Sequence, residues 1–170
     1  MHYGSVGKNL EINLSTGKSH KTAVDTTARE MYLGGRGTNT KLFWDRVPPE
    51  TDPFSPDNLM IFGVGVLTGT LAPGANRTIL TTLSPQTNLQ TYSSLGGFWG
   101  AELKHAGYDN LIISGKSSKP VYLWINDDKA EIRDADHLWG KDIRETSKII
   151  RDELEQKGAQ ILCIGQAGEN

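Results

Sequence analysis

The amino-acid sequence predicts an α+β fold made of many short strands and a few short helices. Its 19 glycines separate short apolar runs, as in chains whose strands are joined by close turns, and this disfavours an all-helical fold. Two segments alternate polar and apolar residues on either side of a turn, which is typical of a β-hairpin. A longer segment repeats apolar residues at helical spacing. The chain is long enough for one domain with a core, spanning residues 1–170.

The first half of the sequence is expected to form a hairpin, two helices and a strand. The turn set Ser15-Thr16-Gly17 joins the strands of the hairpin. Thr26 or Thr27 can cap the first helix, and Gly34-Gly35 stops it, because glycine accepts the left-handed conformation common just past a helix end. The second helix ends before Pro48-Pro49. The expected strands cover residues 9–14, 18–24 and 59–66, and the expected helices cover residues 26–33 and 38–45.

The second half of the sequence repeats much of this order. Asn126-Asp127-Asp128 supplies turn chemistry between two strands, and apolar residues such as Ile143 and Ile150 lie on a charged background, as in an amphipathic helix. We infer an internal duplication in which the second repeat stops early, so that the domain is truncated at its carboxyl end. The expected strands cover residues 110–114, 121–125, 129–133 and 159–164, the last ending at Gly165, and the expected helix covers residues 142–156.

Composition and charge exclude several classes of function. A net charge of −2, from 18 basic and 20 acidic residues, offers no basic face for nucleic acid. The longest apolar stretches, such as residues 59–67, fall far short of the roughly 20 residues that span a membrane, and no signal pattern opens the chain, so a cytoplasmic protein is expected. The single cysteine, Cys163, allows neither a disulfide framework nor a multi-thiolate metal site and is expected in the core.

The stretch from residue 65 to residue 115 carries the pattern of an anion site. Its glycines leave backbone N–H groups unshielded, so that chain and ligand can approach closely. Gly96-Gly97 precedes a short helix expected over residues 98–105, and a helix amino terminus attracts anions. Arg77 adds a planar guanidinium that can grip a phosphate through two bonds. The glycines are Gly65, Gly69, Gly74, Gly96, Gly97 and Gly100.

Each of these features also has a simpler structural interpretation. Arg77 alone could be a solvated residue at a strand edge, and Lys104 with His105 is better explained as a surface helix face than as an acid–base pair. The aromatic pair Phe98-Trp99 is better explained by core packing than by ligand stacking. Residues 34–37 (GGRG) resemble a phosphate loop but lack the lysine and hydroxyl pattern of a P-loop. The residues alone therefore predict a glycine-rich domain with a candidate anion site.

A series of short motifs, in order and over essentially the whole chain, resembles the amino-terminal domain of the aldehyde:ferredoxin oxidoreductase family. No single motif is diagnostic, whereas the set is hard to explain otherwise. The motifs are residues 13–17 (NLSTG), 33–37 (LGGRG), 52–56 (DPFSP), 67–70 (LTGT), 84–85 (SP), 96–98 (GGF), 102–104 (ELK), 106–109 (AGYD), 131–135 (EIRDA), 139–141 (WGK) and 164–170 (IGQAGEN). The resemblance implies two mostly antiparallel β-sheets that form a saddle-like base for a tungsten bis-pyranopterin (tungstopterin) cofactor.

The resemblance also implies which residues bind that cofactor. Arg77 would contact the pterin, and the loop of residues 93–97 would lie beside the phosphates of the two pterins. A magnesium ion bridging those phosphates would take the backbone oxygen of Ser94 as a ligand. A family member carries asparagine at this position, but a main-chain ligand does not depend on the side chain. The implied cofactor-binding residues are Asn76, Arg77, Ser93, Ser94, Leu95, Gly96 and Gly97.

The activity implied by the resemblance is oxidation of aldehydes to carboxylates, with electrons passed to ferredoxin. Residues 76–78, 84–87 and 96–99 are closer to the tungsten subunit of class II benzoyl-CoA reductases, so an acyl-CoA substrate is the alternative, and a non-catalytic binding or assembly subunit is a third interpretation. The 4Fe-4S cluster and the catalytic residues would belong to later domains, so none is assigned to this chain. The expected partners are those domains and ferredoxin or an iron–sulfur subunit, with no nucleic acid and no membrane.

Overall fold

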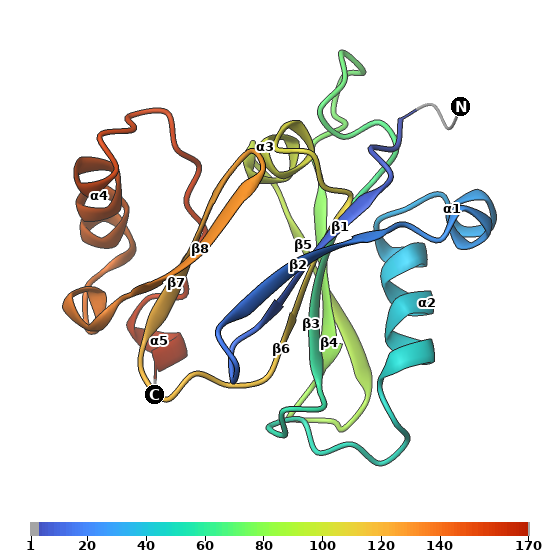
Figure 1. Cartoon of the computed structure of the whole chain (residues 1–170), viewed down its shortest axis with the longest axis horizontal. Coiled ribbons are helices and arrows are strands. Elements are labelled where there is room, and N and C mark those ends of the chain that lie inside the picture. The colour runs from blue at the N-terminus through green and yellow to red at the C-terminus, as the bar shows by residue number, and fades with distance from the viewer. Residues whose placement is uncertain (1–3, 170) are drawn as a thin grey trace.

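The structure, a computed structural model, describes residues 4–169 of the chain and confirms the predicted α+β class (Figure 1). The central sheet has six strands in the order β2-β1-β6-β3-β4-β5, and β7 and β8 form a second sheet; every pairing is antiparallel except that of β1 with β6. The strands are β1 (Lys8–Asn13), β2 (Lys18–Ala23), β3 (Leu59–Val64), β4 (Thr78–Leu83), β5 (Gln90–Leu95), β6 (Asn110–Ser114), β7 (Val121–Asn126) and β8 (Lys129–Asp134). The helices are α1 (Thr26–Tyr32), α2 (Arg36–Arg46), α3 (Trp99–His105), α4 (Ile143–Glu153) and α5 (Gln166–Glu169), with a 3₁₀ turn η1 (Asp136–Leu138). None of the helices in this described part is long and apolar enough to cross a membrane.

Both predicted hairpins form. Strands β1 and β2 pair along their whole length across a turn in which Gly17 has a φ of 67°, a left-handed conformation that suits glycine. Strands β7 and β8 pair likewise across a turn in which Asp127 has a φ of 49°. A further hairpin, β4–β5, lies outside the predicted elements. Its second strand, QTYSSL, is polar and almost wholly exposed, so it carries no alternating apolar pattern.

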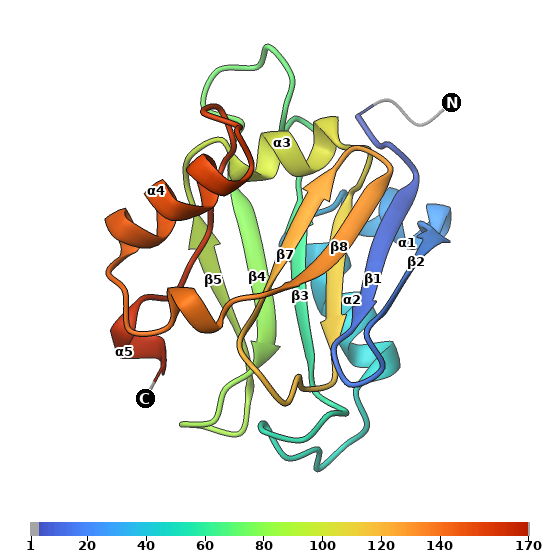
Figure 2. The ribbon, with the colours of Figure 1, turned by 60° about the vertical axis from the view of Figure 1, so that its left-hand side comes forward.

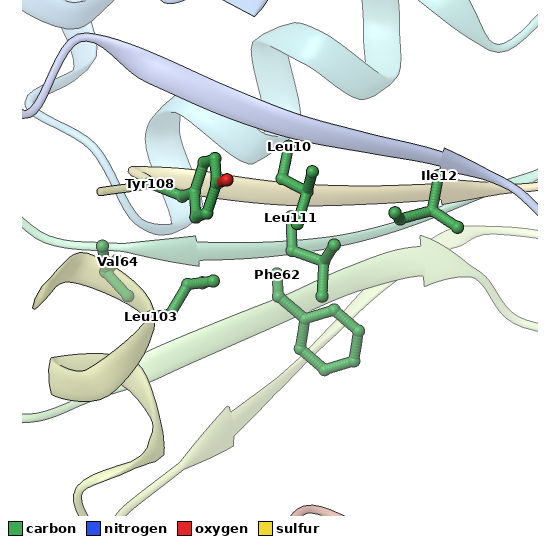
Figure 3. Close-up of a cluster of buried hydrophobic side chains, with 7 residues drawn as sticks. All are labelled: Leu10, Ile12, Phe62, Val64, Leu103, Tyr108 and Leu111. Carbon is green, nitrogen blue, oxygen red and sulfur yellow. The ribbon is translucent and has the colours of Figure 1, made fainter. Parts of the chain in front are cut away.

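Apolar side chains on the two faces of the central sheet form two separate cores. Helix α2 covers one face, where Phe43 packs with a small cluster of strand residues. On the other face, α3 and the β7–β8 hairpin cover a larger cluster (Figures 2 and 3). Both faces of the inner strands are therefore covered, and this fixes strand register, since a shift by one residue would turn the apolar set to the wrong face. The larger cluster consists of Leu10, Ile12, Phe62, Val64, Leu103, Tyr108 and Leu111.

A buried asparagine connects α2 to the central sheet. Asn39 is fully buried, and its Nδ2 donates to the backbone oxygens of Ile61 (3.0 Å) and Ile79 (2.9 Å). Its Oδ1 accepts from Asn110 Nδ2 at 2.8 Å. Gly63 makes room for this amide, because a Cβ there would collide with the Asn39 side chain. These bonds hold the first turns of α2 at a fixed place on the sheet.

The caps of the first helix differ from those expected. Asp25 caps α1, because its carboxylate accepts from the backbone N–H groups of Thr27 (2.9 Å) and Ala28 (3.1 Å). The prediction of Thr26 or Thr27 as the cap is therefore wrong; a carboxylate also interacts favourably with the positive end of the helix dipole. At the other end, Leu33 itself takes the left-handed conformation, with a φ of 62°, one residue before the glycine pair.

The second half departs from the duplication in its last element. Hairpin β7–β8 and helix α4 follow one another as expected, and Asp142 and Glu145 form a reciprocal capping box at the start of α4. The predicted strand over residues 159–164 is wrong. These residues alternate between half-buried and exposed, as in a strand, but no strand pairs with them in the described part of the chain. Cys163 within them is half-exposed, not part of the core.

Candidate functional site

Several glycine-containing segments meet at one end of the central sheet. Because β3, β4 and β5 are successively antiparallel, the end of β3 at Val64, the start of β4 at Thr78 and the end of β5 at Leu95 lie together. The loop between β3 and β4 and the start of α3 lie at the same end in Figure 2. Helix α2 also begins there, because Gly34 forms an isolated bridge with Gly65. We name this set of segments the glycine rim; it comprises residues 34–37, 65–69, 76–77 and 93–97.

Arg77 lies just before strand β4, opposite Gly96. The register of β4 and β5 pairs Thr78 with Leu95, so the next positions along are Arg77 and Gly96. A Cβ added to Gly96 would lie 3.9 Å from Arg77 Nη1, in ordinary van der Waals contact. The Arg77 side chain is exposed and makes no hydrogen bond or ion pair with residues 4–169. Arg77 therefore presents unused donors beside a bare stretch of backbone.

The other predicted site residues differ in their burial and in their contacts. Ser93 and Ser94 are exposed on β5, an edge strand of the described sheet. Leu95 is half-buried and packs against the larger core cluster, which anchors the loop that follows. Gly97 has a φ of 84°, and the space where its Cβ would lie is open. Asn76 is half-buried, and its side chain makes no hydrogen bond within the described residues.

A cation at the glycine rim would have to be bound by oxygen atoms of the backbone and of a ligand. Among residues 4–169, no group of three or more histidine, cysteine, aspartate or glutamate side chains could hold a metal ion. Strand β5, at the sheet edge, leaves main-chain groups on its outer side without a strand partner in the described chain. Phosphates and backbone carbonyls offer the hard oxygen ligands that Mg²⁺ prefers. The donor set fits an anion with an associated cation better than a metal held by side chains.

A second arginine, which the sequence analysis did not assign, reaches the same rim from α2. Gly35 donates its N–H to the backbone oxygen of Val64 (3.1 Å) and so holds the start of α2 against the end of β3. The guanidinium of the next residue, Arg36, lies 4.7 Å from the ring centroid of Tyr92 on β5, at cation–π distance. Tyr92 and Ser94 are two residues apart and share one face of the strand. The glycines that flank Arg36 were the signal in the sequence that could have indicated it.

Lys104 does not form the solvated helix face expected of it. Only 8% of its surface is exposed, and its Nζ donates to the backbone oxygens of Gly65 (2.8 Å) and Val66 (3.0 Å). The neighbouring His105 is exposed, as expected, and its Nε2 lies 3.0 Å from the backbone oxygen of Gly69. The end of α3 therefore holds three carbonyl groups of the glycine rim.

A buried ion pair lies next to this lysine. Asp109 is fully buried, and its carboxylate accepts from Arg29 Nη2 at 3.1 Å. Its other oxygen accepts from the hydroxyl of Ser5 and from the backbone N–H of Gly7, both at 2.7 Å. Burial lowers the pKa of Lys104, the negative charge of Asp109 acts against this shift, and the positive charge of Arg29 adds to it.

The aromatic pair before α3 divides between core and solvent. Trp99 is half-buried and lies 5.3 Å from the ring of Phe62, in the larger core cluster. Phe98 is 66% exposed, so the expectation of core packing is wrong for this ring. Phe98 therefore leaves an exposed apolar surface next to the glycine rim.

The chain belongs to the aldehyde ferredoxin oxidoreductase family, of which it forms the N-terminal domain. The family described as "Aldehyde ferredoxin oxidoreductase, N-terminal domain" matches residues 9–170. This confirms the resemblance seen in the motifs and places the chain in an oxidoreductase context.

Individual proteins of known sequence or structure are similar to this chain over almost its whole length. The tungsten-containing aldehyde ferredoxin oxidoreductases of Pyrococcus furiosus and Thermococcus kodakarensis are each 44% identical over 168 residues, covering 99% of this chain and 28% of theirs. A solved chain from the active site complex BamBC of benzoyl coenzyme A reductase, in complex with 1,5-dienoyl-CoA, is 56% identical with a TM-score of 0.97, covering 100% of this chain and 26% of that one. The chain thus spans about a quarter of the length of these relatives.

Proposed function

We propose that this chain is the cofactor-binding domain of a tungsten-dependent oxidoreductase, and that its glycine rim holds the phosphates of a bis-pyranopterin. The observation that carries the proposal is the guanidinium of Arg77, which has no partner among residues 4–169, beside the bare backbone of Gly96. The tungsten-containing relatives at 44% identity support the choice of metal. When bound, the cofactor supplies the redox chemistry, while the protein supplies binding, orientation and electrostatics.

Each part of the rim has a role in this proposal. Arg77 would donate two parallel bonds to a phosphate, and the backbone N–H groups around Gly96 and Gly97 would bind further oxygens. Arg36 brings a second positive charge to the same rim. Clustered phosphates repel one another, so these charges and a magnesium ion bound by the main-chain oxygen of Ser94 would be needed to hold them.

The names of the relatives suggest two candidate substrates. The relatives at 44% identity are named for aldehydes and ferredoxin, which favours aldehyde oxidation with electrons passed to ferredoxin or an iron–sulfur subunit. The solved chain at 56% identity belongs to a benzoyl coenzyme A reductase complex, and this higher identity favours an aromatic acyl-CoA. The purified full-length protein should be assayed with benzaldehyde and with 1,5-dienoyl-CoA under the same redox dye. Turnover of neither would contradict both candidates, and the third interpretation is a non-catalytic binding or assembly subunit.

The iron–sulfur chemistry of such an enzyme needs residues from outside this chain. Cys163 is its single cysteine, so four thiolates for a 4Fe-4S cluster cannot come from these 170 residues. We therefore propose that the cluster, the catalytic acid–base groups and the contact with the electron acceptor belong to the remaining domains of the same enzyme.

Metal and pterin analysis of the full-length protein tests the cofactor assignment. Wild-type protein grown with tungstate should contain both, and Arg77→Ala should lower its affinity for the cofactor by about 10- to 100-fold, the effect of losing charge-assisted hydrogen bonds. Arg133→Ala is the matched control, because Arg133 pairs with Glu131 on β8, outside the rim. Ser94→Ala should keep its content, since the main-chain oxygen remains.

Two results would contradict the proposal. Wild-type protein without tungsten and pterin would remove the cofactor assignment. Full cofactor content in the Arg77→Ala protein would remove the glycine rim as the place where the phosphates bind.

A further inference from the structure

The burial and hydrogen bonds of the Lys104 side chain differ from those of a lysine on a solvent-exposed helix. A lysine ammonium is rarely buried, because removing its charge from water is costly unless its donors are matched. Here the ammonium is buried and donates hydrogen bonds to two adjacent backbone oxygens, those of Gly65 and Val66. Both oxygens belong to the loop that leads from β3 towards Arg77.

We infer that Lys104 is a positioning residue that fixes Arg77 for cofactor binding, acting through Gly65 and Thr68. The inference rests on the proposed function, because it assigns a role to Lys104 within the same cofactor site. It goes beyond that proposal in naming a residue that touches neither the rim's open side nor Arg77 itself.

A series of hydrogen bonds leads from the Lys104 ammonium, through the backbone of Gly65, to the backbone oxygen of Arg77. Lys104 holds the oxygen of Gly65, and the N–H of Gly65 donates to the hydroxyl of Thr68 at 3.2 Å. That hydroxyl then donates to the backbone oxygen of Arg77 at 3.4 Å. Thr68 is 3% exposed, so water does not compete for these bonds. Since a hydroxyl has one proton, accepting from Gly65 leaves that proton for Arg77.

Helix α3 fixes the other partner of Arg77 at the same time. The loop with Gly96 leads directly into α3, and Gly100 in its first turn packs against Thr78, the residue that follows Arg77. Lys104 stands one turn further along the same helix. Helix α3 therefore holds both sides of the rim, the guanidinium of Arg77 and the backbone opposite it.

The carboxylate of Asp109 offsets part of the cost of burying the positive charge of Lys104. Burial lowers the pKa of Lys104, and the carboxylate of Asp109 acts in the opposite direction. An apolar side chain would avoid the desolvation cost but would leave the half-buried carbonyl of Val66 without this donor, and that of Gly65 with only the backbone N–H of Thr68 at 3.2 Å. A methionine at this position therefore preserves much of the packing and removes only the hold on the loop.

The experiment uses the full-length protein and two independent readouts. Lys104→Met removes the ammonium, Lys104→Arg retains a cation, and Thr68→Val cuts the middle of the series while leaving Lys104 in place. Amide hydrogen exchange over residues 65–77, measured before cofactor loading, reports the hold on the loop. Tungsten and pterin content after loading reports the consequence.

Lys104→Met and Thr68→Val should each speed exchange over residues 65–77 and leave the β7–β8 hairpin unchanged. Cofactor affinity should fall by about 10-fold, as for other residues that orient a ligand-binding group, and Lys104→Arg should restore part of it. In an Arg77→Ala background, Lys104→Met should cause no further loss, because the group it positions is already absent.

Three outcomes would overturn the inference. Exchange that speeds up over the whole domain would make Lys104 a general stabilising residue. An additive loss in the Arg77→Ala background would mean that Lys104 acts independently of Arg77, and unchanged exchange in both Lys104→Met and Thr68→Val would mean that the series does not hold the loop. If wild-type protein binds no tungstopterin, the proposed function fails, yet the exchange measurement still decides whether Lys104 holds the loop.

Discussion

Replacing Gly100 with alanine should push helix α3 away from strand β4 and loosen the glycine rim. Gly100 is buried in the first turn of α3, and the atom nearest to an added Cβ would be Thr78 Oγ1, well inside van der Waals contact. The next atoms are Val64 Cγ1 at 3.2 Å and Thr78 Cβ at 3.3 Å. Thr78 is 1% exposed, so its branched side chain has no solvent to turn into.

Two opposing energies decide the size of the effect. Alanine is favoured over glycine inside a helix by about 1 kcal/mol. Inserting a methyl group into a packed core costs about 1–3 kcal/mol, and the upper part of this range, about 2–3 kcal/mol, applies here because the colliding atoms belong to stiff branched side chains on central strands. We therefore expect a net loss of about 1–2 kcal/mol, or a fall in Tm of about 3–6 °C for a domain of this size. Cofactor affinity should fall as well, since Arg77 adjoins Thr78 and would move relative to Gly96.

Thermal unfolding of the full-length variants, followed by tungsten analysis, checks this expectation. Gly158→Ala is the matched control, because no atom lies within 4 Å of its added Cβ. In a Thr78→Ala background, Gly100→Ala should lower Tm by less, since the nearest colliding atom, Thr78 Oγ1, is gone while Val64 Cγ1 remains. A single Gly100→Ala variant with an unchanged or higher Tm would refute the argument that α3 and β4 are packed without slack at this point.

Further substitutions test the remaining parts of the fold. Burial raises the pKa of Glu11, but its bonds to Arg46 (2.7 Å) outweigh this and the pKa is lowered overall. Glu11→Gln should therefore cost about 1 kcal/mol at neutral pH, and the difference in Tm should shrink as pH falls below 4.5 through the lowered pKa. Asn39→Leu should cost about 3 kcal/mol, because it leaves the buried amide of Asn110 without its acceptor, and a full wild-type Tm would contradict this. Asp142→Ala should remove the cap of α4 at a cost of about 1 kcal/mol in thermal unfolding, with tungsten content unchanged.

The parts of the fold that local chemistry determines could be predicted from the sequence. The two predicted hairpins carry their own turn residues, and α4 carries its own cap and apolar stripe. Residues 159–164 show the limit of this logic. Their alternation is that of a strand, but a strand also needs a partner edge, and none is offered to them within the described residues. Strand β5 shows the opposite limit. It pairs with β4 although its sequence has no apolar pattern, so the pattern could not predict it.

The candidate site was visible only in part for a similar reason. Arg77 and Gly96 could be singled out because glycines and an arginine are themselves signs of an anion site. The place of Arg36 depends on Tyr92, more than 50 residues away, and no local pattern encodes that contact. Lys104 looks like any lysine on a short helix, because its burial is set by carbonyl groups almost 40 residues earlier.

Strand β1 has consequences for how the chain is made on the ribosome. It lies second in the central sheet, and its inner neighbour is β6, so Asn9 pairs with Asn110. Just before it, Ser5 and Gly7 bond to the carboxylate of Asp109. At about 5–20 residues per second, synthesis of the intervening hundred residues takes about 5–20 s. Throughout that interval the edge of β1 that pairs with β6 is open, so β1 is translated long before the strand that encloses it.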